Sequence, residues 1–146
     1  MSAASAWRIL GAMSRENVEV VRKAWEAWLR GDLPALFETY APDIVWDTSH
    51  YRDWPESNYE GVEAVQRFMN EWLAVWDEYE VGVEDIFAAP DGRVVVLFWH
   101  RGKGRSSGLA AEWHAAQVQT VRDGKIKRVD NYEDRAEALE AVGLRE

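Results

Sequence analysis

Side chains on the predicted strands include the acid–base groups that a small enzyme would need. Asp47 lies near the end of a predicted strand over residues 43–48, where alternation places it on the same side as Val45. Burial raises the pKa of a carboxyl group toward the range in which it removes protons from carbon. His100 and His114 lie on strands expected to be neighbours, and imidazole exchanges protons near neutral pH. If the fold buries it, Asp47 could therefore act as a general base, and either His100 or His114 could act as a proton shuttle. The alternatives are an aspartate that bonds loop amides and histidines that belong to the sheet surface.

The sequence gives no reason to expect a metal or another cofactor. It contains no cysteine, which excludes disulfides, thiolate catalysis and cysteine-ligated zinc or iron–sulfur sites. The histidines lack an H-x-x-x-H spacing or a neighbouring carboxylate cluster. The segment GKGRSSG, residues 102–108, lacks the spacing of a phosphate-binding loop, and we expect a hairpin loop there.

Charge and hydropathy exclude two classes of partner. The formal net charge is -9, which would repel the phosphate backbone of a nucleic acid. No apolar run approaches the ~20 residues that span a bilayer, and the first residues lack the pattern of a secretory signal. We therefore expect a cytoplasmic protein without nucleic-acid or membrane partners.

Aromatic residues are unusually frequent, with nine Trp, five Tyr and four Phe in 146 residues. Indoles suit either a bulky core or the wall of an apolar cavity, and composition does not decide between the two. The helical spacing of Trp25, Trp28, Trp72 and Trp76 favours core packing for that set. If several others face inward, the cavity favours a flat, apolar, even polycyclic ligand. The aromatic candidates for its wall are Trp46, Tyr51, Trp54, Tyr59, Trp72, Trp99 and Trp113.

The helices and strands that must position these residues are predicted from hydrophobic periodicity and from the residues that typically begin or end such elements. Residues 1–13 show no lasting periodicity and are predicted to be a flexible extension, with Met13 as a possible natural start; residues 14–146 are predicted to be a single domain. Three helices are expected, from Ser14, from Asp32 to Tyr40, and from Gly61 to Trp76. Residues 49–60 are expected to be a loop. Further strands joined by hairpin turns are expected over 79–89, 93–101, 109–121 and 126–132, before a short last helix.

Several segments together resemble a known family. They are RENVEVVRKAWEAWLRGDLPALFETYAPDIVWD, YEGVEAVQRF, GKGRSSG and RDGKIKRVDNYEDRAEALEAVGL. Over about residues 14–144 the chain resembles the SnoaL-like branch of the nuclear transport factor 2-like, or cystatin-like, superfamily. The resemblance implies an α+β fold in which three N-terminal helices pack on a strongly curved antiparallel sheet with a mixed edge. This sheet would form a cone-shaped half-barrel around a pocket, followed by a short C-terminal helix, and the chains would pair as homodimers.

Members of this superfamily include polyketide cyclases, ketosteroid isomerases, epoxide hydrolases, dehydratases and proteins that only bind. The resemblance implies that Asp47 stands where an isomerase has its base, and that Gln117 stands near the position of a protonated acid. Gln117 can still donate a hydrogen bond to a carbonyl oxygen. Arg101 and Asn131 stand where an epoxide hydrolase has carboxylates, so that hydrolysis is not expected. Both remain candidate ligand-binding residues.

Three hypotheses follow. The first is a cofactor-independent isomerase, cyclase or lyase, with Asp47 as base and His114, Gln117 or Asn131 as polar partners. The second is a protein that binds a small apolar or polycyclic molecule without changing it. The third is a dimerisation module whose cavity is filled by tryptophans.

Overall fold

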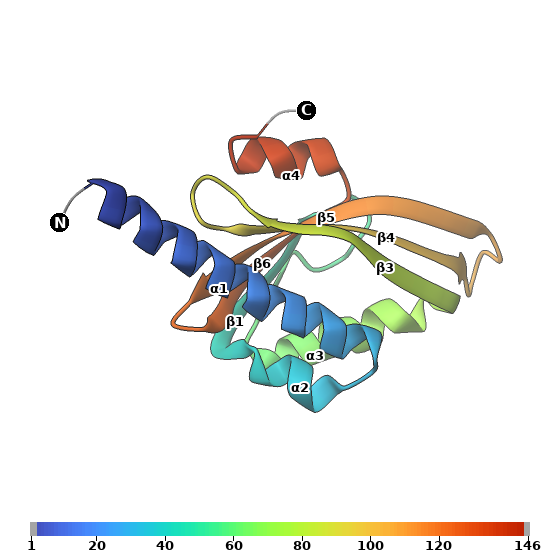
Figure 1. Ribbon diagram of the computed structural model, residues 1–146. Coiled ribbons are helices and arrows are strands. Elements are labelled where there is room, and N and C mark those ends of the chain that lie inside the picture. The colour runs from blue at the N-terminus through green and yellow to red at the C-terminus, as the bar shows by residue number, and fades with distance from the viewer. Residues whose placement is uncertain (1–2, 145–146) are drawn as a thin grey trace.

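The computed structural model describes residues 3–144, and it describes side chains from residue 13 onward (Figure 1). Three helices and two strands come first, and four consecutive long strands and a last helix follow. The α+β class predicted from the sequence is confirmed. The elements in chain order are α1 (Ala3–Leu29), α2 (Leu33–Glu38), β1 (Tyr40–His50), β2 (Asn58–Glu60), α3 (Val62–Ala74), β3 (Trp76–Ala88), β4 (Val94–Gly104), β5 (Ala110–Arg122), β6 (Lys125–Tyr132) and α4 (Arg135–Ala141).

The strands form one six-stranded sheet in the order β2-β1-β6-β5-β4-β3. Strands β1 and β6 pair in parallel and all other neighbours pair in antiparallel, so the sheet has the predicted mixed edge. The sheet is strongly curved and does not close. Helices α1, α2 and α3 lie on one side of it and α4 lies on the other (Figure 1). Within residues 3–144, no helix is both long and apolar enough to cross a membrane.

The start of the first helix differs from its prediction. Helix α1 begins at Ala3 and runs without a break through Ser14, which was expected to cap it. Residues 3–13 contain good helix formers and no proline, so nothing in their sequence ends a helix before Ser14. Residues 1–2 lie outside the described residues. The flexibility of the extension and the domain boundary at residue 14 stay predictions.

Two aromatic residues predicted at helix ends are the first residues of strands. Helix α2 ends before Thr39, whose Oγ1 donates to the Leu36 carbonyl at 2.6 Å, and Tyr40 then pairs with Ile126 of β6. Trp76 likewise opens β3 instead of closing α3. The predicted loop over 49–60 contains the short strand β2. The sequence did not reveal this strand, because three residues are too few to show a period of two.

Strand alternation divides the buried residues into two clusters. Ala115, Gln117 and Gln119 on β5 point to the concave face, which α1, α2 and α3 cover. Their neighbours Ala116 and Val118 point to the other face, where they pack with Ala138 and Val142 around α4. The parity of β5 therefore decides which of its side chains can meet a ligand.

Candidate ligand-binding site

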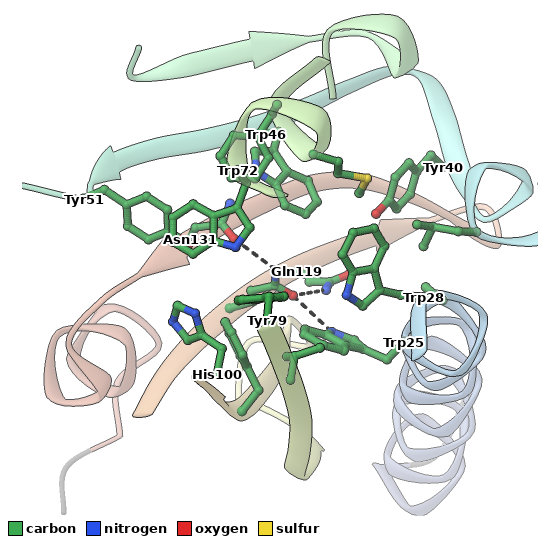
Figure 2. A pocket seen from close by; sticks show the side chains of 17 residues that line it. Trp25, Trp28, Tyr40, Trp46, Tyr51, Trp72, Tyr79, His100, Gln119 and Asn131 are labelled. Carbon is green, nitrogen blue, oxygen red and sulfur yellow. Dashed lines mark hydrogen bonds between the residues drawn. The ribbon is translucent and has the colours of Figure 1, made fainter. Parts of the chain in front are cut away.

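A cavity lies between the three covering helices and the concave face of the sheet (Figure 2). The cavity has a volume of about 70 Å³ and opens to solvent. That volume corresponds to roughly five water molecules. Aromatic and aliphatic side chains form most of the wall. The lining residues are Ala24, Trp25, Trp28, Leu36, Tyr40, Trp46, Tyr51, Phe68, Met69, Trp72, Tyr79, Val81, Phe98, His100, Gln117, Gln119 and Asn131.

A chain of amide hydrogen bonds crosses the sheet side of the cavity (Figure 2). Gln119 Nε2 donates to Gln117 Oε1 at 2.8 Å, and Trp25 Nε1 donates to the same oxygen at 3.1 Å. Gln117 Nε2 donates to Asn131 Oδ1 at 3.0 Å, and Asn131 Nδ2 donates to the backbone oxygen of Asp47 at 3.0 Å. Gln117 and Asn131 are register partners on β5 and β6, which brings their amides together.

The two ends of this chain fix its direction. An indole N–H can only donate, so Trp25 requires an oxygen at its end of Gln117. A backbone carbonyl can only accept, so the Asp47 oxygen requires the amino group of Asn131. With Gln117 Oε1 fixed, the near atom of Gln119 has to be its amino nitrogen, and Gln119 Oε1 points away from the chain. A flipped Gln119 amide would place two oxygens against each other.

Three polar atoms of the lining residues have no partner. In the described part of the chain, four buried side-chain atoms lack a hydrogen bond, and three of them belong to Trp46, His100 and Gln119. They are the Nε1–H donor of Trp46, Nδ1 of His100 and the Oε1 acceptor of Gln119. A buried polar atom without a partner costs about 1–3 kcal/mol. The lining therefore holds hydrogen-bonding capacity that the folded chain does not use.

Among the described residues, those that line the cavity carry no charge at neutral pH. Its titratable lining residues are His100, Tyr40, Tyr51 and Tyr79, and no carboxylate or basic side chain lines it among the described residues. Burial lowers the pKa of His100 to about 4, so that its imidazole is neutral. Burial raises the pKa of Tyr79 to about 12 and raises the pKa values of Tyr40 and Tyr51 well above their usual range. A neutral ligand meets no opposing charge in such a site, whereas an anion finds no counter-ion.

Five of the predicted residues line the cavity. They are Trp46, Tyr51, Trp72, Gln117 and Asn131. Trp54 and Tyr59 were also predicted to contact ligand, but they lie behind the wall. Trp54 Nε1 donates to the Tyr59 hydroxyl at 2.8 Å, and both rings pack against Phe68. Their placement there is a correction to the prediction.

Asp47 and His114, which were predicted to face a substrate, do not line the cavity. Alternation along β1 turns Trp46 inward and therefore turns the Asp47 side chain, with Val45, away. Asp47 Oδ1 accepts from Ser49, and Oδ2 lies 3.3 Å from Arg128. His114 lies between Glu84 and Glu112 and is half-exposed.

The remaining candidates from β4 and β5 also lie outside the cavity. The Arg101 guanidinium lies 5.2 Å from the Trp99 ring centroid, and Arg101 pairs with Glu80 at 2.6 Å. Both Trp99 and Arg101 have the strand parity opposite to that of His100. Trp113 shares the parity of His100 and stacks on its ring at 5.2 Å, but 37% of Trp113 is exposed and it stands beyond the lining.

Sequence reasoning missed Gln119, Tyr40 and Tyr79, and it considered His100 without selecting it. Gln119 follows Gln117 by two residues, so alternation alone could have placed both amides on one face. Tyr40 and Tyr79 had no such signal, because the first was assigned to the wrong element and the second stands near a strand end. Among the side chains described, those of residues 13–144, no cluster of three histidine, aspartate or glutamate residues is placed to hold a metal ion.

The SnoaL-like domain family matches this chain over residues 21–129, and the chain belongs to that family. The predicted resemblance is thereby confirmed. An uncharacterized protein of Mycobacterium tuberculosis, Rv0034, is 26% identical over 117 residues, which are 80% of this chain and 87% of the relative.

Solved structures show the same fold. An NTF2-like protein of unknown function from Burkholderia pseudomallei superposes with a TM-score of 0.69 at 22% identity, covering 88% of this chain and 98% of that one. Mycobacterium tuberculosis RV0760c, in complex with estradiol-17beta-hemisuccinate, superposes with a TM-score of 0.66 at 18% identity, covering 82% and 94%.

Proposed function

We propose that this protein binds a small, neutral, largely apolar molecule in the cavity under α1, α2 and α3. One observation carries the proposal: the aromatic wall contains buried polar atoms on Trp46, His100 and Gln119 that have no partner in the folded chain. A cavity that served only as packing would gain from apolar groups at these positions. The steroid derivative bound by the structural relative RV0760c supports a ringed ligand.

Binding without chemistry is favoured over proton abstraction by a carboxylate. Asp47, the predicted base, faces away from the cavity, and no other carboxylate lines it among the described residues. A general base has to reach the proton that it removes, directly or through one water. The third hypothesis, a cavity filled by tryptophans, is disfavoured by the open space that remains between the rings.

Binding can be tested with two tryptophans that differ in the face they occupy. Trp72 lines the cavity, whereas Trp99 lies on the other face of the sheet. Titration calorimetry with 2-naphthol and 2-fluoronaphthalene should give measurable affinity for the native protein. Trp72→Leu should weaken binding at least fivefold, while Trp99→Leu should leave it unchanged. Loss of affinity in both variants, or no binding to the native protein, would refute the proposal.

His100 favours a second candidate function, proton transfer without a cofactor. It is the one lining residue, among those described, whose ordinary pKa lies near neutrality, and its Nδ1 lacks a partner. A neutral imidazole can accept a proton from a bound ligand and return it to another atom, as an isomerase requires. With a ligand that is turned over, His100→Gln should abolish turnover while affinity changes little. Retained turnover would exclude this function.

The homodimer and the cytoplasmic location remain proposals from the family resemblance and the composition. The outer face of the sheet carries the partly buried Trp99 beside Arg101, which gives such a dimer an aromatic contact. Sedimentation at micromolar concentration should show a dimer that Trp99→Glu disrupts. A native monomer would contradict the assembly.

A further inference from the structure

The free end of the amide chain is a hydrogen-bond acceptor, Gln119 Oε1. Each amide in the chain donates toward Asp47, from Gln119 through Gln117 and Asn131. Gln119 Oε1 is left without a donor, and the residue is only 3% exposed. The oxygen atom itself is buried from solvent.

A hydrogen-bond donor lies in the row of register partners that crosses β5, β6 and β1 at Gln119. Val129 of β6 pairs with Gln119 on one side and with Trp46 on the other, so these two side chains flank it on the concave face. Their Cα atoms are two strand spacings apart, or about 10 Å. The Nε1–H of Trp46, a residue that is 6% exposed, has no acceptor. An acceptor on one side of the row and a donor on the other are the pattern that a hydroxyl-bearing ring can match.

We infer that the cavity selects the neutral hydroxyl form of a ringed compound, whose O–H donates to Gln119 Oε1, over its ketone, ether or carboxylate counterparts. This inference rests on the proposed function. A ketone or ether brings only acceptors toward Gln119 Oε1, so that the oxygen stays unpaired. A carboxylate adds an uncompensated charge in a lining without a cation. Reaching the oxygen requires a small rotation of the side chains around it.

The selection can be measured with ligands of nearly equal size. We would titrate the native protein calorimetrically with 2-naphthol, with 2-fluoronaphthalene, which lacks the donor, and with 2-naphthoate, which is an anion. 2-Naphthol should bind about tenfold more tightly than 2-fluoronaphthalene, because its donor satisfies a buried acceptor. 2-Naphthoate should bind at least tenfold more weakly than 2-naphthol. Equal affinity for 2-naphthol and 2-fluoronaphthalene would overturn the inference while leaving the proposed function standing.

Two variants assign the preference to one atom. Gln119→Met keeps the length of the side chain and removes the acceptor, and it should reduce the preference for 2-naphthol to less than about twofold. Thr120→Val, the next residue on β5 with opposite parity, should keep the full preference. A preference that survives Gln119→Met would overturn the inference. If no compound binds the native protein, the proposed function fails and this inference with it; the native comparison stands even if Gln119→Met does not fold.

Discussion

Trp25 on α1 donates its indole N–H to Gln117 Oε1 on β5 at 3.1 Å, across 92 positions of sequence. The same indole packs against Phe98 with ring centroids 5.1 Å apart. The first contact orients the Gln117 amide, and the second holds the helix against the sheet. Because Gln117 Oε1 accepts from both Trp25 and Gln119, the contact with α1 also fixes the direction of the Gln119 amide.

Gln117→Met should destabilise the fold more than any other single change in the amide chain. It removes three hydrogen bonds and leaves Trp25, Gln119 and Asn131 with unpaired buried groups. We expect the free energy of unfolding to fall by about 2–4 kcal/mol in urea denaturation, since each orphaned group costs about 1–3 kcal/mol and such costs are not additive. Gln119→Met removes one of these bonds and should cost about 1 kcal/mol. Equal losses of unfolding free energy in the two variants would show that the amide hydrogen bonds do not act as a connected unit.

Asp47→Asn should leave ligand affinity unchanged within about twofold. The substitution keeps an oxygen for Ser49 and does not alter the backbone oxygen that Asn131 uses. It removes the charge partner of Arg128, which retains Asp130 at 3.0 Å, so the cost in stability should stay below about 1 kcal/mol. Calorimetry with 2-naphthol beside the Trp72→Leu variant checks this expectation. A loss of affinity as large as that of Trp72→Leu would contradict this prediction and show that Asp47 contributes to binding.

The sequence predicted the architecture well because its signals are local. Helical spacing located the covering helices, and hairpin turns with period-two segments located β3 to β6 within a few residues. The errors lie where tertiary pairing overrides local preference. Tyr40 and Trp76 fit a helical period but pair with Ile126 and Gly104 in the sheet.

The site was harder to predict, because it depends on which face of each strand is concave. Asp47 was correctly placed on the side of Val45, but no local signal tells whether that side faces the helices. The inward direction of Trp46 settles the parity of β1, and it follows from packing against Tyr40 and Phe68, which are distant from each other in sequence. Which buried atoms lack a hydrogen-bond partner can be determined only from the assembled sheet, because these atoms belong to different strands.

Stability should fall as the pH is lowered from about 6.5 to about 4, in part because of His100. Burial lowers the pKa of this imidazole from 6.5 to about 4. Between these two pH values the histidine of the unfolded chain binds a proton that the native chain does not bind. The stabilising contribution is complete above pH 6.5 and is lost as the pH falls through the native pKa. At about 1.4 kcal/mol per pKa unit, the loss approaches about 3 kcal/mol.

His100→Gln lacks this titration and serves as the comparison for the pH dependence. Other groups titrate in both proteins, so the difference between the two unfolding free energies isolates the contribution of His100. That difference should be constant from pH 7 to pH 8 and should shift in favour of the variant by up to about 3 kcal/mol near pH 4. Parallel pH profiles for the two proteins would show that the imidazole is not kept neutral by burial.

Gly82→Ala should destabilise the protein through a steric conflict with Trp99 on the face opposite the cavity. The two residues are register partners on β3 and β4, and an added Cβ at Gly82 would lie 2.6 Å from Cε2 of the indole. Overpacking of this kind costs about 1–3 kcal/mol, which thermal or urea unfolding measures. In the Trp99→Leu background the same substitution should be neutral or stabilising, because alanine loses less backbone entropy than glycine. Equal costs in both backgrounds would mean that the indole is not the obstacle. Affinity for 2-naphthol should not change in either protein, since the cavity lies on the other side of the sheet.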